Sequence, residues 1–112
     1  MRLYCDIDGL EDNWIEISDA WTRREYKDMV DAESAEFFDI LHAKATACHI
    51  ETSEGVIEDP ADITEDSIDD VDMRLVGFIG SVLVSACVRL RSLGNASARA
   101  SSDGTAQLPP KD

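Results

Sequence analysis

The side chains most often used for metal binding and nucleophilic catalysis are few in this chain. The cysteines are Cys5, Cys48 and Cys87, and the two histidines are His42 and His49. Zinc sites use ligands at clustered spacings such as Cys-x2-Cys, which this sequence lacks. The two histidines also give no basis for a Ser–His–Asp or Cys–His arrangement. We therefore expect no metal, no cofactor and no catalytic residue, and we expect the cysteines to act as small core hydrophobes.

Acidic side chains are the second candidate for chemistry, because carboxylates bind calcium. Glu51–Asp72 holds ten acidic residues and no basic one. An EF-hand loop needs oxygen ligands at its first, third and fifth positions, glycine at the sixth and glutamate at the twelfth. Counted from Asp62, the sixth residue is Ser67 and the twelfth is Met73, so the pattern fails. We interpret this acidic segment as a solvated surface that affects solubility and partner choice.

Leu3–Gly9 resembles the first motif of haloacid-dehalogenase-type phosphatases, an apolar strand that ends in Asp-x-Asp-Gly. The resemblance implies that Asp6 is a nucleophile and Asp8 a general acid, on a doubly wound sheet. That sheet is larger than a chain of 112 residues easily holds, and Trp14–Ile17 has the pattern of a returning strand. In the other interpretation, Asp8 and Gly9 form the turn of a β-hairpin. A minimal phosphatase stays as a second alternative.

The overall charge limits the class of partner. A chain of 112 residues is expected to form one domain, and its net charge is −14. Nucleic-acid binding depends on basic residues that neutralise phosphates, and anionic membranes attract basic segments, so neither is an expected partner. The segment Met1–Asp6 lacks the apolar core of a signal peptide. The expected location is a reducing cytoplasm, which agrees with the scattered, odd number of cysteines.

Two β-hairpins are predicted from alternating apolar and polar residues. Met1–Ile7 and Trp14–Ile17 form the first hairpin. Thr46–Thr52 and Val56–Ile57 form the second, around a turn at Ser53–Gly55. Each hairpin is expected to pack one face on the helices.

The first helix has a strong start signal. Thr22 and Glu25 have the spacing of a capping box, in which each side chain accepts a hydrogen bond from the other residue's backbone N–H. Trp21 and Tyr26 stand at the positions of a hydrophobic staple, in which two apolar side chains clamp the helix entry. These signals predict a helix over Arg23–Val30.

Further helices are predicted in the rest of the chain. After a break at Asp31–Ser34, a second helix is expected to include Phe37–Lys44. Thr64 can cap a third helix, and the acidic residues in its first turn favour a helix start. This helix is expected to pause near Asp72. The last helix is then expected over Met73–Leu93.

The last helix is the most apolar element. Its predicted core stripe consists of Leu75, Ile79, Val82, Ala86, Leu90 and Leu93, which follow helical spacing. Gly94-Asn95 is a suitable C-terminal stop. Asn95–Asp112 is rich in Ala, Ser, Gly and Pro, which predicts a disordered tail. The sequence therefore predicts an α+β domain over residues 1–94, with two hairpins packed against three to four helices, and a tail over residues 95–112.

A stripe of small residues runs along the same helix. Gly77, Ser81 and Ser85 recur at every fourth position, which lets another backbone approach closely. That backbone could belong to this protein's own strands and helices or to a partner. A membrane span is disfavoured, because the fourteen uncharged residues Leu75–Val88 are fewer than the about 17 that a bilayer needs.

The order of these features resembles tail assembly chaperones and related small tail proteins of long-tailed bacteriophages and prophages. The features that carry the resemblance are Gly9–Ile17, Trp21–Glu25, the helices that follow, the Gly55 hairpin, Glu58–Pro60, the acidic Thr64-led helix and the apolar last helix, and it covers residues 3–93. It implies a non-enzymatic cytoplasmic protein of the bacterial host cell that binds the tape measure protein and recruits tail tube subunits. In many members a translational frameshift appends a second domain.

The predicted partner-binding residues combine the small stripe with acids beside it. They are Gly77, Ser81, Ser85, Asp69, Asp70 and Asp72. Apolar contact would supply most of the affinity, and charge would set encounter rate and partner choice. The domain is expected to be either monomeric or self-associating. The alternative is a small acidic adaptor or inhibitor, of the antitoxin or DNA-mimic type, which accounts for the charge but not for the apolar helix.

Overall fold

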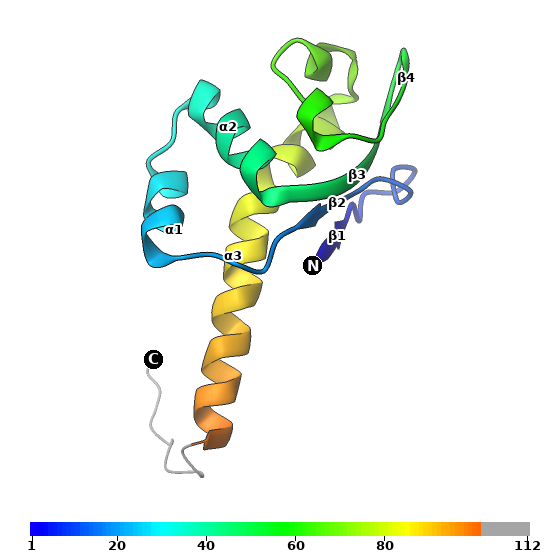
Figure 1. Ribbon diagram of the computed structural model, residues 1–112. Coiled ribbons are helices and arrows are strands. Elements are labelled where there is room, and N and C mark those ends of the chain that lie inside the picture. The colour runs from blue at the N-terminus through cyan, green and yellow to red at the C-terminus, as the bar shows by residue number, and fades with distance from the viewer. Residues whose placement is uncertain (102–112) are drawn as a thin grey trace.

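One antiparallel sheet and three α-helices make up the fold (Figure 1). The computed structural model describes the backbone of residues 1–101 and the side chains of residues 1–92 except that of Ser34. In chain order the elements are β1 (Arg2–Tyr4), β2 (Trp14–Ile17), α1 (Arg23–Val30), α2 (Ser34–Lys44), β3 (Ala45–Thr52), β4 (Gly55–Ile57), the 3-10 turns η1 (Pro60–Asp62) and η2 (Ser67–Asp70), and α3 (Met73–Ser101). The predicted α+β class is confirmed.

The two predicted hairpins are present, and they join into one sheet. The strand order is β1-β2-β3-β4, and each neighbouring pair is antiparallel. The join is made by β2 and β3, where Ile15 is opposite Cys48. The register shifts between Glu16 and Ile17. The alternating pattern holds in β2, where Ile15 and Ile17 are fully buried and Trp14 and Glu16 are half-buried.

The turns of both hairpins lie where glycine was expected. Gly9 has a φ of +89°, and the Leu10 N–H donates to the Ile7 carbonyl oxygen at 2.9 Å. Gly55 begins β4 with a φ of +137°, a conformation that is strained for any residue with a side chain. The first strand is shorter than the predicted Met1–Ile7: it spans Arg2–Tyr4, and just beyond it the Cys5 N–H donates to the Asn13 carbonyl oxygen at 2.9 Å.

The predicted start of α1 is confirmed in detail. The Glu25 N–H donates to Thr22 Oγ1 at 3.1 Å, and the Thr22 N–H donates to Glu25 Oε1 at 2.8 Å. These reciprocal bonds satisfy two backbone donors that a helix start otherwise leaves free. Trp21 and Tyr26 are both half-buried against the core.

The predicted Thr64-led α-helix is wrong. That segment forms only the short 3-10 turn η2, although Thr64 Oγ1 does accept a hydrogen bond from the Ser67 N–H at 3.1 Å. An α-helix there would bring Glu65 beside Asp69 and Asp66 beside Asp70, four residues apart. Like charges at that spacing destabilise helices, so the acidic composition opposes the predicted helix.

The predicted stop at Gly94-Asn95 is also wrong, because α3 continues to Ser101. Gly94 costs the helix only about 1 kcal/mol relative to alanine, and the alanines that follow Gly94 favour the helix. Residues 95–101 therefore extend α3 instead of beginning the predicted tail. Residues 102–112 lie outside the described part of the chain, and so does the prediction of disorder for them.

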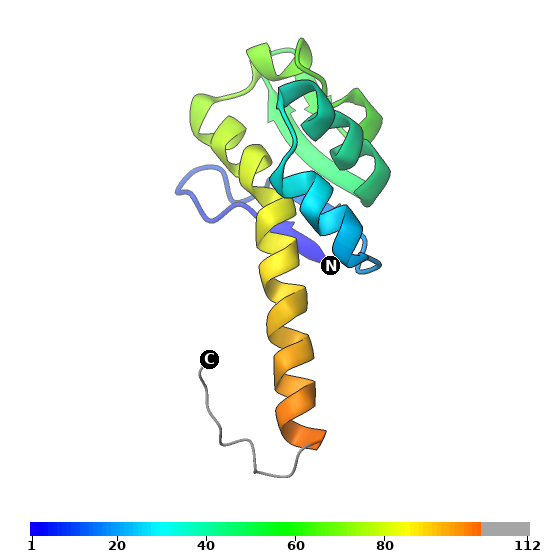
Figure 2. The same cartoon turned by 90° about the vertical axis from the view of Figure 1, so that its left-hand side faces the viewer.

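The core lies between one face of the sheet and α3. The strands contribute Leu3, Ile15, Ile17, Cys48 and Ile50, the residue after β1 contributes Cys5, and α3 contributes Leu75, Ile79, Val82, Leu83, Ala86 and Cys87. Four residues of the predicted stripe are buried, Leu90 is half-buried, and the side chain of Leu93 is not described. In both views, the C-terminal part of α3 extends beyond the rest of the molecule (Figures 1 and 2).

Candidate functional site

One side of α3 packs on the sheet, and the opposite side is uncovered along most of the same length. This open face consists of Met73, Gly77, Gly80, Ser81, Val84 and Val88, which are all exposed and lie on one side of the helix by its 3.6-residue period. Three of them are large and apolar: Met73 is 81% exposed, Val84 49% and Val88 54%. An apolar helix face in water is unfavourable unless another surface covers it, so the open face is the strongest candidate for a binding site.

The small residues of the open face leave room for a neighbouring backbone. A Cβ atom added at Gly77 or at Gly80 would meet nothing within 4 Å outside its own helix. Ser81 is exposed, and its hydroxyl donates to the Phe78 carbonyl oxygen of the previous turn at 2.9 Å. The protein's own strands and helices therefore do not fill the space beside Gly77 and Gly80.

Ser85 differs from the other two members of the predicted stripe. It is half-buried, and together with Ser81 it lines a hollow of about 170 Å³ between α3 and β1, to which Tyr4 and Arg89 also contribute. The predicted stripe thus divides: Gly77 and Ser81 lie on the open face, and Ser85 lies at its edge beside β1.

The acids predicted to set partner choice lie at the N-terminal end of α3. All ten acidic residues of Glu51–Asp72 are exposed, including Asp69 and Asp70 of η2 and Asp72 just before α3. The Arg74 side chain donates to Asp72 at 3.1 Å, and the Arg74 N–H donates to the same carboxylate at 2.8 Å. These two bonds lower the pKa of Asp72 below its usual value. A dense negative surface therefore adjoins one end of the open face.

The two aspartates of the phosphatase hypothesis are both exposed. Asp8 belongs to the hairpin turn, in which the Gly9 N–H donates to Glu11 Oε1 at 2.8 Å. Asp6 lines the hollow beside Ser85. Both aspartates follow β1, which belongs to an antiparallel sheet, whereas the resemblance to haloacid-dehalogenase-type phosphatases implies a doubly wound one.

The cysteines and histidines lie in structural surroundings. Cys5, Cys48 and Cys87 are buried and free. Burial raises the pKa of the Cys48 thiol to about 11, with nearby acids adding to the shift, so this thiol is poorly suited to act as a nucleophile. His42 Nε2 lies 2.7 Å from the Ile63 carbonyl oxygen. Among the described residues, no three His, Cys, Asp or Glu side chains are placed to hold a metal ion.

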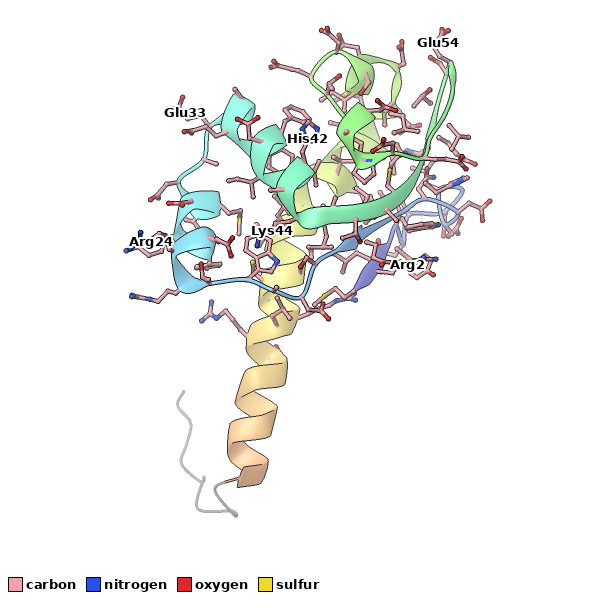
Figure 3. The ribbon with its side chains drawn as sticks, in the orientation of Figure 1. Arg2, Arg24, Glu33, His42, Lys44 and Glu54 are labelled. Atoms are coloured by element: carbon pink, nitrogen blue, oxygen red, sulfur yellow. The ribbon has the colours of Figure 1, made fainter. Side chains whose placement is uncertain are left out.

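The sequence did not predict a hollow between the start of α1 and the middle of α3. It has a volume of about 490 Å³, and its lining combines Trp21 and Tyr26 with Leu90 and Arg91 of α3. Lys44 lies at one side, with Nζ 4.9 Å from the centre of the Trp21 ring and 2.9 Å from Glu25 (Figure 3). The staple residues indicated an apolar contact here, but no local pattern indicates that α3 passes beside them.

Asn13 is the one buried polar side chain among the described residues, and no sequence pattern predicted its role. Its Oδ1 accepts from the Glu51 N–H at 2.7 Å, and its Nδ2 donates to the Leu10 carbonyl oxygen at 3.0 Å. It therefore ties the first hairpin loop to β3. A buried amide needs such partners, which marks Asn13 as a structural residue.

No family model, curated protein or solved structure matches this chain. Within the described part of the chain, the segment Met73–Ser92 is long and apolar enough to cross a membrane by length and composition, and a core helix passes the same test. Six α3 side chains are part of the core formed with the sheet. Inserting α3 into a bilayer would remove them from that core, which favours α3 as a structural helix with one uncovered face.

Proposed function

We propose that this protein is a non-enzymatic, tail-assembly-chaperone-like protein that binds a helical protein partner on the open face of α3. The observation that carries the proposal is the exposure of Met73, Val84 and Val88 around two glycines in an otherwise highly charged chain. Apart from the Thr64-led helix, which does not form, the order of the elements resembles that of phage tail assembly chaperones, and this resemblance supports the tape measure and tail tube proteins as partners. The proposal places the protein in the cytoplasm of a bacterial host cell.

The binding mode follows from the two parts of the site. An apolar helix laid along the open face would bury the valines and methionine, and the glycines would let it approach closely. Asp69, Asp70 and Asp72 would attract a partner with basic residues at the matching end, and would repel acidic competitors. Apolar contact would then determine affinity and the acids would determine the rate of encounter.

The test is co-expression with the tape measure and tail tube proteins of the same gene cluster, followed by pull-down. Val84→Asp, on the open face, should abolish capture. Val56→Asp is the matched control, because Val56 on β4 is 50% exposed and Val84 49%. Capture that survives Val84→Asp, or that Val56→Asp abolishes equally, would exclude the open face as the binding site.

The alternative function is that of an acidic adaptor or inhibitor, such as an antitoxin or a DNA mimic. The exposure of all ten acids in Glu51–Asp72 favours it, because a solvated negative surface can compete for a basic partner. Under this alternative, binding would weaken steeply with salt and would be insensitive to Val84→Asp. The pull-down at two salt concentrations therefore separates the two functions.

A further inference from the structure

The hollow between the start of α1 and the middle of α3 combines an aromatic lining with arginines. We propose that it binds a small aromatic carboxylate that carries a single negative charge. None of the described residues that line this hollow belongs to the open face. The inference therefore goes beyond the proposed function, because it concerns a second site and a different class of ligand.

The size and the walls of the hollow suit a flat apolar group. Its volume of about 490 Å³ lies within the range of ~300–1,000 Å³ that is usual for small-molecule sites. Trp21 and Tyr26 supply aromatic surface, and Cys87 and Leu90 of α3 supply further apolar surface. Aromatic rings pack favourably on one another in stacked or edge-to-face arrangements. The lining therefore selects an aromatic ligand over a wholly polar one.

The aromatic rings of the lining are already held in place in the single chain. The Trp21 Nε1–H donates to the Ser18 carbonyl oxygen at 2.9 Å, and Lys44 Nζ lies 4.9 Å from the centre of the Trp21 ring. The Arg91 guanidinium lies over the Tyr26 ring, with Cζ 5.9 Å from its centre. Side chains that are fixed in this way lose little conformational entropy when a ligand binds.

The charges around the hollow favour an anion, although the whole chain carries a net charge of −14. Arg23 and Arg91 both line the hollow, and neither forms an ion pair with a described carboxylate. Asp19 is the one acid in the described lining, and its side chain is 71% exposed to water. Glu25 is paired with Lys44 at 2.9 Å. Two guanidinium groups can therefore bind a carboxylate, with which arginine forms charge-assisted hydrogen bonds.

The net charge of the chain limits how much charge the ligand can carry. Repulsion by the acids of the rest of the chain grows in proportion to the charge of the ligand. An acidic protein segment or a dianionic phosphate is therefore repelled more strongly than a monocarboxylate. A free small molecule with one carboxylate thus matches the local arginines at the least cost from the distant acids.

Three ligands of similar shape test the predicted chemistry. Cinnamate, cinnamamide and cinnamylamine share a flat aromatic body and carry a negative charge, no charge and a positive charge. In NMR titrations at constant ionic strength, cinnamate should shift the indole N–H signal of Trp21 saturably. The signal of Trp14 is the internal control and should not shift, because Trp14 lies on β2 with Arg2 over its ring. Cinnamamide should bind about tenfold more weakly, and cinnamylamine should give no saturable shift.

Arginine variants test the position of the carboxylate, each with a nearby arginine as its matched control. Arg23→Gln and Arg91→Gln should each raise the dissociation constant of cinnamate about threefold, and the double variant about tenfold. Arg24→Gln and Arg89→Gln make the same change in net charge at exposed positions outside this hollow, and should leave the constant unchanged. All four arginines are exposed, so circular dichroism melts should show that every variant is folded.

The titrations can refute both the site and the ligand class. Cinnamate that shifts neither indole signal, or that shifts both alike, would refute the hollow as its site. Equal binding of cinnamamide and cinnamate, or equal weakening by Arg89→Gln and Arg91→Gln, would refute an anion held by the arginines of the hollow. These titrations use the purified chain alone, whereas the proposed function is tested with tail proteins. Each proposal can therefore fail without the other.

Discussion

Replacing Gly77 by leucine should stabilise the folded chain and at the same time abolish association through α3. Gly77 lies within α3, and a Cβ atom there would meet nothing within 4 Å. Glycine is about 1 kcal/mol less favourable than alanine inside a helix, and leucine is close to alanine, so the expected gain is roughly 0.8 kcal/mol. For a domain of this size that gain raises the midpoint of thermal unfolding by roughly 3–6 °C.

Gly55 provides the matched control for this substitution. A Cβ atom there also meets nothing within 4 Å, but its φ of +137° is strained for leucine. Gly55→Leu should therefore lower stability by about 1–3 kcal/mol, opposite in sign to Gly77→Leu. Circular dichroism melts and urea titrations measure both effects. A lower midpoint for Gly77→Leu would show that the open face packs on the chain itself, and would refute this face as the proposed binding site.

Three further predictions concern the cap, the acids and the aspartate motif. Thr22→Ala should lower the free energy of unfolding in urea by about 1 kcal/mol, because it removes the cap of α1; no change would contradict the role of the capping box. Replacing Asp69, Asp70 and Asp72 together by asparagine should slow partner association and flatten its salt dependence in stopped-flow measurements, whereas an unchanged salt dependence would exclude these acids. Asp6→Asn should leave partner capture intact. If the native chain instead hydrolyses a phosphoester with magnesium, and Asp6→Asn abolishes that hydrolysis, the phosphatase alternative is established.

The features that the sequence predicted well are those decided by residues close together in the chain. The capping box of Thr22 and Glu25 needs only four residues, and the structure forms both of its hydrogen bonds. The alternation that buries Ile15 and Ile17 on one face is equally local. The helical spacing of α3 predicted its buried side, because the sheet offers one apolar surface on which to pack.

The features that the sequence did not predict depend on contacts between distant segments. Nothing near β2 indicates that it pairs with β3, and so the two hairpins were not expected to share a sheet. The hollow beside Trp21 exists only because Leu90 of α3 passes it. The role of Asn13 depends on the backbone of Glu51, which lies 38 residues away in sequence.

The candidate site illustrates the same limit within one helix. The spacing of α3 predicted four of its buried residues, but the helix is apolar on nearly every side, so spacing alone did not show where its buried side ends. In the structure, Leu83 is fully buried and its neighbour Val84 is 49% exposed. Burial of Leu83 stabilises the fold, whereas exposure of Val84 stabilises nothing in the single chain. Since opposite sides of α3 carry the core and the open face, folding and association can be changed separately by mutation.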